Sequence, residues 1–331
     1  MKVAVVGATG MVGNIMLKVL AERNFPITEL IPVASEKSVG KSIAYKNKEY
    51  TIIGLEAAVA AKPDIAIFSA GGATSLEWAP KFAAVGTTVI DNSSAWRMNP
   101  DNKLIVPEIN ADVLTKTDKI IANPNCSTIQ MVVTLKPLMD AFGLEAVTVS
   151  TYQSVSGTGK NALEELSMQQ SQIVNAEALT NSVYDRPIVN NIIPAIDTLD
   201  NNEHCFEEQK MIEETRKILD ISELPVYATT ARVPLPLCHS ESITAELSRE
   251  VSIEELQSIF RNAEGIRFSD GGGYQNLPDP RSVAGQREVW VARLRLPFGK
   301  TRSKVVQYWN IADNLKKGAA TNAVQILKYL L

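Results

Sequence analysis

The fold is indicated most clearly near the start of the chain, where the sequence reads Val3-Ala4-Val5-Val6-Gly7-Ala8-Thr9-Gly10-Met11-Val12-Gly13. Its first four residues are apolar and mostly β-branched, which is typical of a strand buried on both faces. Residues 11–24 carry apolar side chains at helical spacing, so a helix is expected directly after the glycines. The stretch therefore predicts a strand, a glycine-rich turn and a helix.

The three glycines of this turn indicate a dinucleotide site. Gly7 allows the tight turn, Gly10 lets the backbone approach a pyrophosphate, and Gly13 allows the helix to pack closely on the strand. The N–H groups at the helix N-terminus favour the phosphate charge. Glycines in any tight turn would look similar, but this motif stands at the first strand–helix junction. The residues expected at the cofactor here are Gly7, Thr9, Gly10, Met11, Val12 and Gly13.

The residues that follow continue the alternation of strands and helices. Apolar runs at 28–34, 65–68 and 87–90 predict buried strands, and 76–85 predicts a helix between the last two. Such alternation predicts an α/β Rossmann-type domain with a doubly wound parallel sheet. We place this dinucleotide-binding domain at residues 1–125.

Beyond residue 125 the apolar pattern changes its period. Residues 243–247 and 290–296 alternate with period two, which is typical of strands with one packed face. In the second segment, Trp290 and Ala292 are expected on the face opposite Arg293. Helices are expected at 127–142, 161–174, 207–218 and 253–263. We therefore expect a second, α+β domain with a large mixed sheet at 126–313, and a C-terminal helix at 314–331 that completes the first domain.

Length and composition exclude several classes of protein. The chain has 331 residues, 45% of them hydrophobic, a net charge of -4 and no basic block, so no nucleic-acid or membrane partner is expected. No apolar run is long enough to span a bilayer, and the N-terminus lacks the apolar stretch of a signal peptide. Three cysteines, an odd number, argue against a disulfide framework and for a reducing compartment. We expect a cytoplasmic protein.

The end of the second strand indicates which dinucleotide binds. An NAD site usually has an acidic residue about 20 residues after the glycines, where it binds the ribose 2′-hydroxyl. Here Ser35, Lys37 and Ser38 instead offer hydroxyls and a positive charge, which suit the 2′-phosphate of NADP. Glu36 argues against this assignment, and Lys37 could equally be a solvated loop charge. The sequence favours NADP and leaves use of both dinucleotides open.

Cys126 is the candidate nucleophile. It follows Asn123-Pro124-Asn125 and opens a long apolar helix, where the helix dipole and N–H groups stabilise a thiolate. The alternative is a small hydrophobic residue in a turn, which the preceding Asn and Pro favour in any case. Cys205 and Cys238 each stand next to a histidine, and adjacent residues of an extended segment point to opposite faces. Because the spacing C-x-x-C is also absent, no metal site is expected.

The two histidines lie in different surroundings. His204 lies in an acidic, polar stretch and is expected to be exposed. His239 lies in an apolar run with a single arginine, Arg232, and two interpretations stay open: a hydrogen-bonded core histidine, or the proton carrier that a cysteine nucleophile needs. Residues 157–160, Gly-Thr-Gly-Lys, do not form an NTPase phosphate loop, because the earlier glycine and the following Ser or Thr are missing.

Taken together, motifs along nearly the whole chain resemble the aspartate-semialdehyde dehydrogenase family. Besides the glycine turn and the residues at 123–128, the resemblance is carried by 91–97 (Asp-Asn-Ser-Ser-Ala-Trp-Arg), 106–110 (Val-Pro-Glu-Ile-Asn), 154–160, 207–210 (Glu-Glu-Gln-Lys), 232–234 and 313–320. The resemblance implies reduction of L-aspartyl-4-phosphate by NADPH to L-aspartate 4-semialdehyde and phosphate, in the biosynthesis of lysine, threonine and methionine. It also implies a catalytic and dimerisation role for the second domain, in homodimers or homotetramers.

The resemblance further implies a role for individual residues. Cys126 would form an acyl thioester, His239 would be its acid/base partner, and Gln153 would orient the thioester. The residues implied at the substrate are Arg232 and Glu207 for its carboxylate and ammonium groups, Arg97 and Lys210 for its phosphoryl group, and Asn125. Those implied at the cofactor, beyond the glycine turn and the second strand, are Ser156, Gly157 and Asn314. Many relatives carry an arginine where this chain has Glu36-Lys37, which weakens the preference for NADP.

Other proteins share parts of this pattern. N-acetyl-glutamyl-phosphate reductase and glyceraldehyde-3-phosphate dehydrogenase use the same cofactor fold and thioester chemistry, but the segments at 93–97 and 207–210 favour the aspartyl substrate. A nucleotide-binding regulator without activity would be expected to lack at least one of Cys126, His239 and Arg232. All three are present.

Overall fold

A computed structural model describes residues 1–330, which divide into two compact units. Unit 1 comprises residues 1–125 and 318–330, unit 2 comprises Cys126–Lys317, and residue 331, the end of the predicted C-terminal helix, lies outside the described residues. Each unit is described by itself. Among the residues described, no helix is long and apolar enough to cross a membrane.

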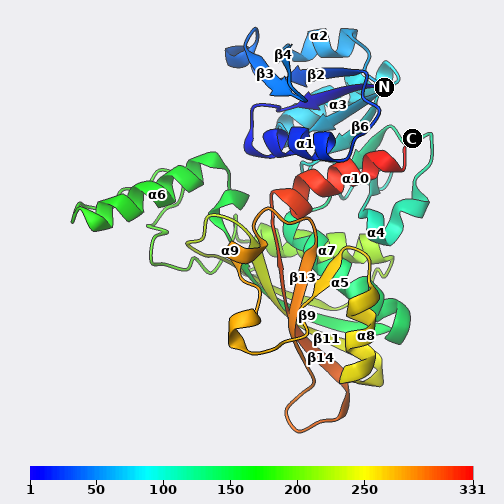
Figure 1. Ribbon diagram of the computed structural model, residues 1–331, viewed down its shortest axis with the longest axis vertical. Coiled ribbons are helices and arrows are strands. Elements are labelled where there is room, and N and C mark those ends of the chain that lie inside the picture. Colours follow the sequence, from blue (N-terminus) through cyan, green and yellow to red (C-terminus); the bar gives the residue numbers. More distant parts are fainter. Residues whose placement is uncertain (331) are drawn as a thin grey trace. The chain divides into compact units, whose positions relative to one another are not determined.

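Unit 1 is built on a six-stranded sheet with the strand order β2-β1-β5-β6-β8-β7 (Figure 1). Every neighbouring pair in this sheet is parallel. Its strands are β1 (Lys2–Val6), β2 (Glu29–Val33), β5 (Ile65–Phe68), β6 (Thr88–Asp91), β7 (Lys103–Leu104) and β8 (Ile120–Ala122). A separate hairpin is formed by β3 (Ser42–Tyr45) and β4 (Lys48–Thr51). The helices are α1 (Met11–Glu22), α2 (Leu55–Ala60), α3 (Gly72–Ala84), α4 (Pro107–Asn110) and α10 (Asn322–Lys328).

Both faces of this parallel sheet are buried, because alternate residues of each strand meet helices on opposite sides. One face carries Val3, Val5, Ile65, Ile67, Ile90 and Ile121, packed with Met16 and Leu20 of α1 and with Val324 and Leu327 of α10. The other carries Ala4, Val6, Ile31, Val33, Ala66, Phe68 and Val89, packed with Ala58 of α2 and with Ala79 and Phe82 of α3. The expected doubly wound Rossmann-type sheet is confirmed.

Unit 2 is built on a six-stranded mixed sheet with the order β10-β9-β11-β14-β13-β12. The outer pairs β10–β9 and β12–β13 are parallel, and the pairs between them are antiparallel. The strands are β9 (Leu144–Gln153), β10 (Val226–Arg232), β11 (His239–Ser252), β12 (Ile266–Phe268), β13 (Val289–Arg295) and β14 (Arg302–Ala312). The helices are α5 (Cys126–Phe142), α6 (Lys160–Val174), α7 (Phe206–Leu219), α8 (Ile253–Asn262) and α9 (Pro280–Val283). The expected large mixed sheet is therefore present.

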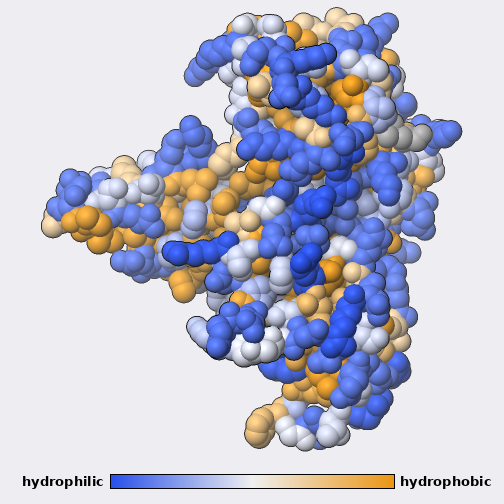
Figure 2. Space-filling view, viewed as in Figure 1, coloured by the Kyte–Doolittle hydropathy of each residue, from blue (hydrophilic) through white to orange (hydrophobic). Residues whose placement is uncertain are grey.

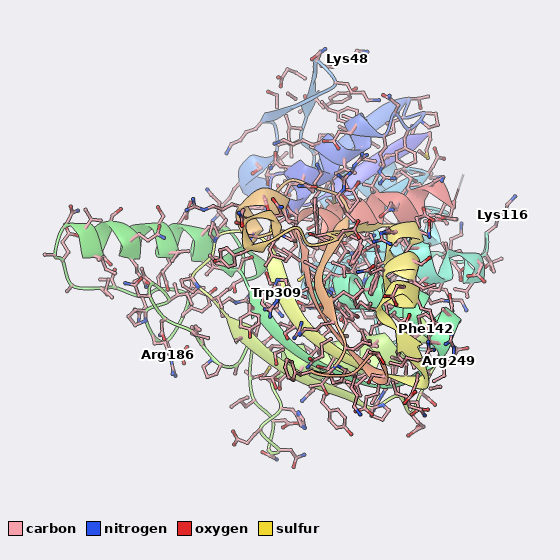
Figure 3. All side chains as sticks on the ribbon, turned by 60° about the horizontal axis from the view of Figure 1, so that its bottom comes forward. Lys48, Lys116, Phe142, Arg186, Arg249 and Trp309 are labelled. Carbon is pink, nitrogen blue, oxygen red and sulfur yellow. The ribbon has the colours of Figure 1, made fainter. Side chains whose placement is uncertain are left out.

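Helices α5, α7 and α8 pack on the sheet of unit 2, where they contact β11, β10 and β13 among others. At the end of α5, the Arg249 guanidinium carbon lies 4.6 Å from the centre of the Phe142 ring (Figure 3). Helix α6 projects from the sheet as an arm, and Figure 2 shows apolar surface along it. The exposed apolar side chains of this segment are Met168, Ile173, Val174 and Leu179.

Three expectations need correction. The strict alternation expected at 290–296 fails, because β13 has an irregularity after Ala292, and Arg293 adopts a φ of 53°. As a result Val291 and Ala292 are both buried and Arg293 is exposed. The helix expected at 76–85 begins at Gly72. The C-terminal helix expected at 314–331 starts as a π-helical turn, Lys316–Thr321, before α10, and residues 314–317 belong to unit 2.

Candidate active site

Three of the predicted site residues lie side by side across the sheet of unit 2. Gln153 ends β9, Arg232 ends β10 and His239 begins β11. The strand register pairs Gln153 with Arg232 on one side and with His239 on the other. All three are at most 5% exposed. The fold thus gathers an amide, a guanidinium and an imidazole at one end of three neighbouring strands.

His239 is held as a neutral ring in a defined orientation. The main-chain N–H of Ser154 donates to His239 Nδ1 at 3.1 Å, so the neutral ring carries its proton on Nε2. Nε2 is buried and has no hydrogen-bond partner among the described residues. Burial, with a smaller contribution from the Arg232 charge, lowers the pKa of His239 from 6.5 to about 3. At neutral pH the ring therefore offers an N–H from Nε2.

Arg232 lies directly beside this ring, and Gly157 makes room for both. Arg232 Nη1 donates to the main-chain oxygen of Ser154 at 2.8 Å. A Cβ atom on Gly157 would stand 2.9 Å from Arg232 Nη1 and 3.2 Å from His239 Nε2. Gly157 was predicted to contact the cofactor. A side chain at this position would press against the arginine and the histidine.

A second group of candidates is linked through helix α7. Gln153 Nε2 donates to Glu207 Oε1 at 3.1 Å, and Lys210 Nζ lies 2.9 Å from Glu207 Oε2. Glu207, in the first turn of α7, is 4% exposed. A pocket of about 690 Å³ in unit 2 is lined by Glu207, Lys210 and Arg232, together with Gly157 and residues 183–186 and 193–199. One pocket therefore contains two cations and one anion from the predicted substrate-binding set.

Cys126 is the first residue of α5 and is partly exposed, so the cysteine expected just before a helix lies at its N-terminus. No cysteine within residues 1–330 forms a disulfide. Cys205 and Cys238 are fully buried, and burial raises the pKa of the Cys238 thiol to about 12. His204 is exposed as expected. These environments favour Cys126 as the reactive thiol.

The remaining substrate candidates, Arg97 and Asn125, belong to unit 1. Arg97 is 8% exposed and donates through Nε to the main-chain oxygen of Asn123 (3.0 Å) and through Nη2 to that of Asn92 (2.8 Å). These two main-chain oxygens orient the guanidinium. Asn125 is 7% exposed, directly before Cys126.

The glycine turn lines a pocket of about 310 Å³ at the carboxyl ends of β1, β2 and β5. Gly7 has a φ of 85°, and a Cβ there would stand 2.2 Å from the Ser69 main-chain oxygen. A Cβ on Gly13 would stand 2.1 Å from the Gly7 oxygen, so both positions require glycine. Helix α1 begins after Gly10, and this N-cap residue makes no side-chain hydrogen bond to the helix. This arrangement suits a phosphate group.

The end of β2 only partly matches the predicted 2′-phosphate site. Ser35 lines the pocket of the glycine turn, but Lys37 and Ser38, in a short turn at Glu36–Ser38, do not. Ser35, Glu36 and Lys37 are all exposed. Glu36 Oε1 lies 3.1 Å from the position of a Cβ on Gly54, which precedes α2.

The other predicted cofactor residues form a buried hydrogen-bond cluster in unit 2. Asn314 Nδ2 donates to Ser156 Oγ at 3.0 Å, and the Cys238 N–H donates to Asn314 Oδ1 at 3.0 Å. Ser154 Oγ and Ser156 Oγ lie 3.0 Å apart. Sequence reasoning did not assign a role to Ser154. Its main-chain N–H and its hydroxyl both contact His239 Nδ1, at 3.1 Å and 3.2 Å, and the one sequence signal for it is its place at the start of the motif at 154–160.

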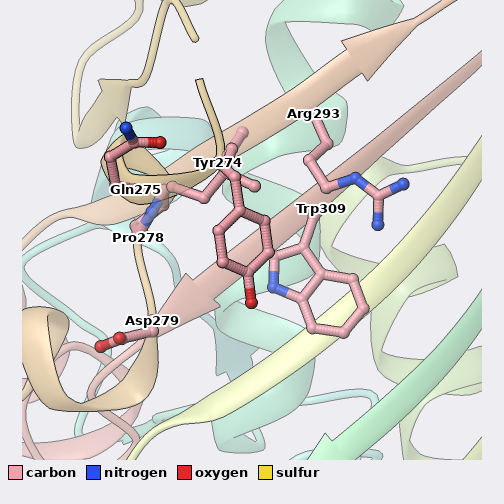
Figure 4. Close-up of a pocket in the computed structure, with 8 residues that line it drawn as sticks. Tyr274, Gln275, Pro278, Asp279, Arg293 and Trp309 are labelled. Atoms are coloured by element: carbon pink, nitrogen blue, oxygen red, sulfur yellow. The ribbon is translucent and has the colours of Figure 1, made fainter. Parts of the chain in front are cut away.

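A further pocket in unit 2, of about 350 Å³, contains none of the predicted site residues (Figure 4). It is lined by Tyr274, Gln275, Leu277, Pro278, Asp279, Ala292, Arg293 and Trp309. Part of its lining comes from the glycine- and proline-rich loop at 270–286. Among the residues described, no group of three or more metal-binding side chains occurs.

Comparisons with known proteins agree with this arrangement. Residues 2–117 match the model "Semialdehyde dehydrogenase, NAD binding domain", and residues 135–317 match "Semialdehyde dehydrogenase, dimerisation domain". An aspartate-semialdehyde dehydrogenase of Aquifex aeolicus (strain VF5) is 47% identical, with 100% of this chain and 98% of that protein covered.

Solved structures give the same answer. The crystal structure of aspartate semialdehyde dehydrogenase II from Vibrio cholerae is similar at a TM-score of 0.95 and 40% identity, covering 99% of this chain and 98% of that one. The same enzyme complexed with ASA is equally similar, covering 99% and 97%. The sequence, the fold and these relatives agree that the chain belongs to the aspartate-semialdehyde dehydrogenase family of enzymes.

Proposed function

We propose that this protein reduces L-aspartyl-4-phosphate with NADPH, giving L-aspartate 4-semialdehyde and phosphate through a thioester on Cys126. The observation that carries the proposal is the row of Gln153, Arg232 and His239 at one end of the sheet in unit 2, with Glu207 bonded to Gln153. Membership of the family and the Vibrio cholerae enzyme complexed with ASA support the substrate. The functional boundaries at residues 125 and 313 and a cytoplasmic location are part of the same proposal.

The reaction needs a hydride, and the residues of unit 1 fit the dinucleotide that would supply it. Its pyrophosphate fits the N-terminus of α1, which has no side-chain cap, and the turn at Gly7 and Gly13, where a side chain would clash with the backbone. We assign the adenosine end to Ser35, Lys37 and Ser38, and further contacts to Ser156, Gly157 and Asn314. Residues 33–35, the last residue of β2 and the two that follow it, carry no acidic side chain, which supports NADP over NAD.

Cys126 begins the chemistry. Its thiolate attacks the acyl carbon of the substrate, the carbon–oxygen bond to the phosphoryl group breaks, and phosphate leaves with the electron pair. Position at the N-terminus of α5 stabilises the thiolate through the helix dipole. We assign Gln153 to orient the resulting thioester and Asn125 to contact the substrate beside it.

We assign His239 as the acid/base group of the reduction step. Reduction of the thioester leaves negative charge on the carbonyl oxygen, and the Nε2–H of a neutral imidazole can donate to it. When the carbon–sulfur bond breaks, the aldehyde re-forms and Cys126 leaves as thiolate. The low pKa of His239 keeps the ring neutral, so its Nε2–H can stabilise the oxyanion by a hydrogen bond without a positive charge on the ring.

The remaining charges match the substrate. Arg232 would bind its carboxylate by paired N–H groups, and Glu207 would bind its ammonium group. We assign the phosphoryl group to Arg97 and Lys210. Since Lys210 also lies 3.6 Å from Asp197 Oδ2, its ammonium group is held at the rim of the pocket by two carboxylates.

We also propose that the protein is a homodimer or a dimer of dimers. Unit 2 matches a dimerisation domain, and one face of its sheet carries exposed aromatic side chains. Tyr152 is 37% exposed and Tyr227 63%, and the rings of Tyr152 and Trp309 lie 5.2 Å apart. Aromatic residues are enriched in the cores of protein interfaces.

The reverse reaction tests the function most simply. Aspartate semialdehyde, phosphate and NADP are mixed with the protein, and the absorbance of NADPH is followed, with NAD compared in a parallel cuvette. We expect NADPH formation that depends on phosphate and is faster than with NAD. No reaction from a folded, dinucleotide-binding protein would refute the proposal and direct attention to N-acetyl-glutamyl phosphate as substrate.

A further inference from the structure

Glu241 is a buried acidic residue that the reaction above does not use. It lies on β11 two residues after His239, so both side chains point to the same face of the sheet. Its neighbours across the strands are Thr151 of β9 and Asn310 of β14. The side chain is 0% exposed, and neither of its carboxyl oxygens has a hydrogen-bond partner.

The neighbouring Gln130 connects this position to the nucleophile. It lies one turn after Cys126 on α5, on the same side of the helix. Gln130 Nε2 donates to Asn310 Oδ1 at 3.0 Å and to the main-chain oxygen of His239 at 3.3 Å. Its Oε1 atom has no hydrogen-bond partner. Gln130 thus ties the helix that begins with Cys126 to the strand that begins with His239.

The surroundings of Glu241 favour its neutral form. The titratable groups that face it are Glu207 of α7, Tyr308 of β14 and His239 of its own strand, and none of them is a cation at neutral pH. The pKa of Glu241 is raised to about 8, mainly by burial; the nearby amides of Asn310 and Gln130 oppose this rise, and the charge of Glu207 adds to it. A protonated carboxyl group has an O–H to donate, and the unpartnered oxygen nearby belongs to Gln130.

We infer that Glu241, as a neutral carboxylic acid, is a positioning residue that acts through Gln130 to set the placement of Cys126 relative to His239. The inference rests on the proposed function, in which these two residues are nucleophile and acid/base group. An ionised carboxylate at position 241 would have no cation among the groups that face it. We therefore expect ionisation of Glu241 to disturb the core and to shift α5 relative to β11.

The test compares two variants with a matched control in the full-length protein. Glu241→Gln keeps the shape and polarity of the neutral acid, whereas Glu241→Leu removes both polar atoms. Tyr308→Phe is the control, because it removes another buried polar contact between α5 and the sheet, the 3.0 Å pair of Thr134 Oγ1 and Tyr308 Oη, without touching Gln130. The reverse reaction is measured between about pH 6 and pH 9.5, together with the rate at which iodoacetamide alkylates Cys126.

We expect Glu241→Gln to keep kcat within about threefold at pH 7, and Glu241→Leu to lose more than about tenfold in kcat with little change in KM. The wild-type kcat should fall as the pH rises past about 8, and Glu241→Gln should lack this fall. Tyr308→Phe should keep the wild-type pH profile.

Three results would overturn the inference. Glu241→Gln could lose as much kcat as Glu241→Leu, or its kcat could fall at alkaline pH as the wild-type kcat does. The third such result is a fully active Glu241→Leu variant. If Glu241→Leu does not fold, the pH dependence of kcat in Glu241→Gln still tests the inference. An inactive wild type instead refutes the proposed function, and the pH dependence of Cys126 alkylation then tests the placement without any substrate.

Discussion

At the scale of single residues, the site depends on what surrounds each side chain more than on the side chain itself. His239 is an ordinary histidine in sequence, but the Ser154 N–H fixes its tautomer, and burial beside Arg232 keeps it neutral. Ser154 stands 85 residues before His239 in the chain. The pair of interpretations left open for His239, core residue or proton carrier, turns out not to be exclusive, because the ring is buried and its Nε2 atom remains unpartnered.

This environment predicts a specific dependence of stability on pH. The pKa of His239 is about 3 in the folded chain and near 6.5 when unfolded, so the unfolded chain binds more protons between these values. The stabilising contribution of the neutral His239 ring to the free energy of unfolding should therefore be fully present above pH 6.5 and be lost as the pH drops towards 3. His239→Asn should show a shallower fall, measured by urea unfolding at several pH values, and should lose about 10²- to 10⁴-fold in rate. Equal pH slopes for variant and wild type would show that His239 is not held neutral.

At the scale of elements, the ends of strands and the starts of helices place the chemistry. Gln153, Arg232 and His239 stand at the ends of β9, β10 and β11, and the short turn at Val155–Gly157 closes over them. Gly157, the last residue of this turn, lies closest to Arg232 and His239. The turn has no room for a side chain there.

Gly157→Ala tests this tight turn. Its methyl group must displace the Arg232 guanidinium or the His239 ring by a few tenths of an ångström or more. We expect kcat/KM for aspartate semialdehyde to fall roughly 10- to 100-fold, because small misplacements of reacting groups slow catalysis strongly. The melting temperature and NADPH affinity serve as controls for folding and cofactor binding. Normal kinetics with an alanine at 157 would mean that the turn has room to relax.

The first domain could be predicted well from sequence, whereas the second could be predicted only in part. Apolar strands such as 65–68 can be recognised from a few consecutive residues, and the glycine turn marks the junction between the first strand and the first helix. The long strands β9, β10 and β14 went unassigned, because their outward faces carry mixed polar and aromatic residues that hide the period. Neither the strand register that joins Gln153 to His239 nor the bulge at Arg293 has a local signal, since both depend on residues distant in sequence.

At the scale of the whole molecule, each of the two units holds part of the proposed site, and the residues proposed at the cofactor are divided between them. Unit 1 holds the glycine turn, Arg97 and Asn125, and unit 2 holds Cys126 and the row ending β9, β10 and β11. Unit 2 also carries the exposed aromatic face that we assign to subunit contact.

Tyr227→Asp tests that assignment. An aspartate in place of this 63% exposed tyrosine would bring a charge into a buried interface and should shift the protein towards monomers. Light scattering after size-exclusion chromatography measures the mass. Phe298→Asp, a change at another exposed aromatic residue in the loop between β13 and β14, should leave the assembly intact. If both variants behave alike, the interface lies elsewhere.

The thioester on Cys126 can be observed by mass spectrometry of the trapped intermediate. The protein is incubated with aspartate semialdehyde and NADP in the absence of phosphate, digested, and compared with Cys126→Ala. We predict an added aspartyl group on the Cys126 peptide, its loss when phosphate is added, and no adduct or turnover in Cys126→Ala, which should still bind NADPH. Turnover without this adduct, or an adduct on Cys205 or Cys238, would contradict the account.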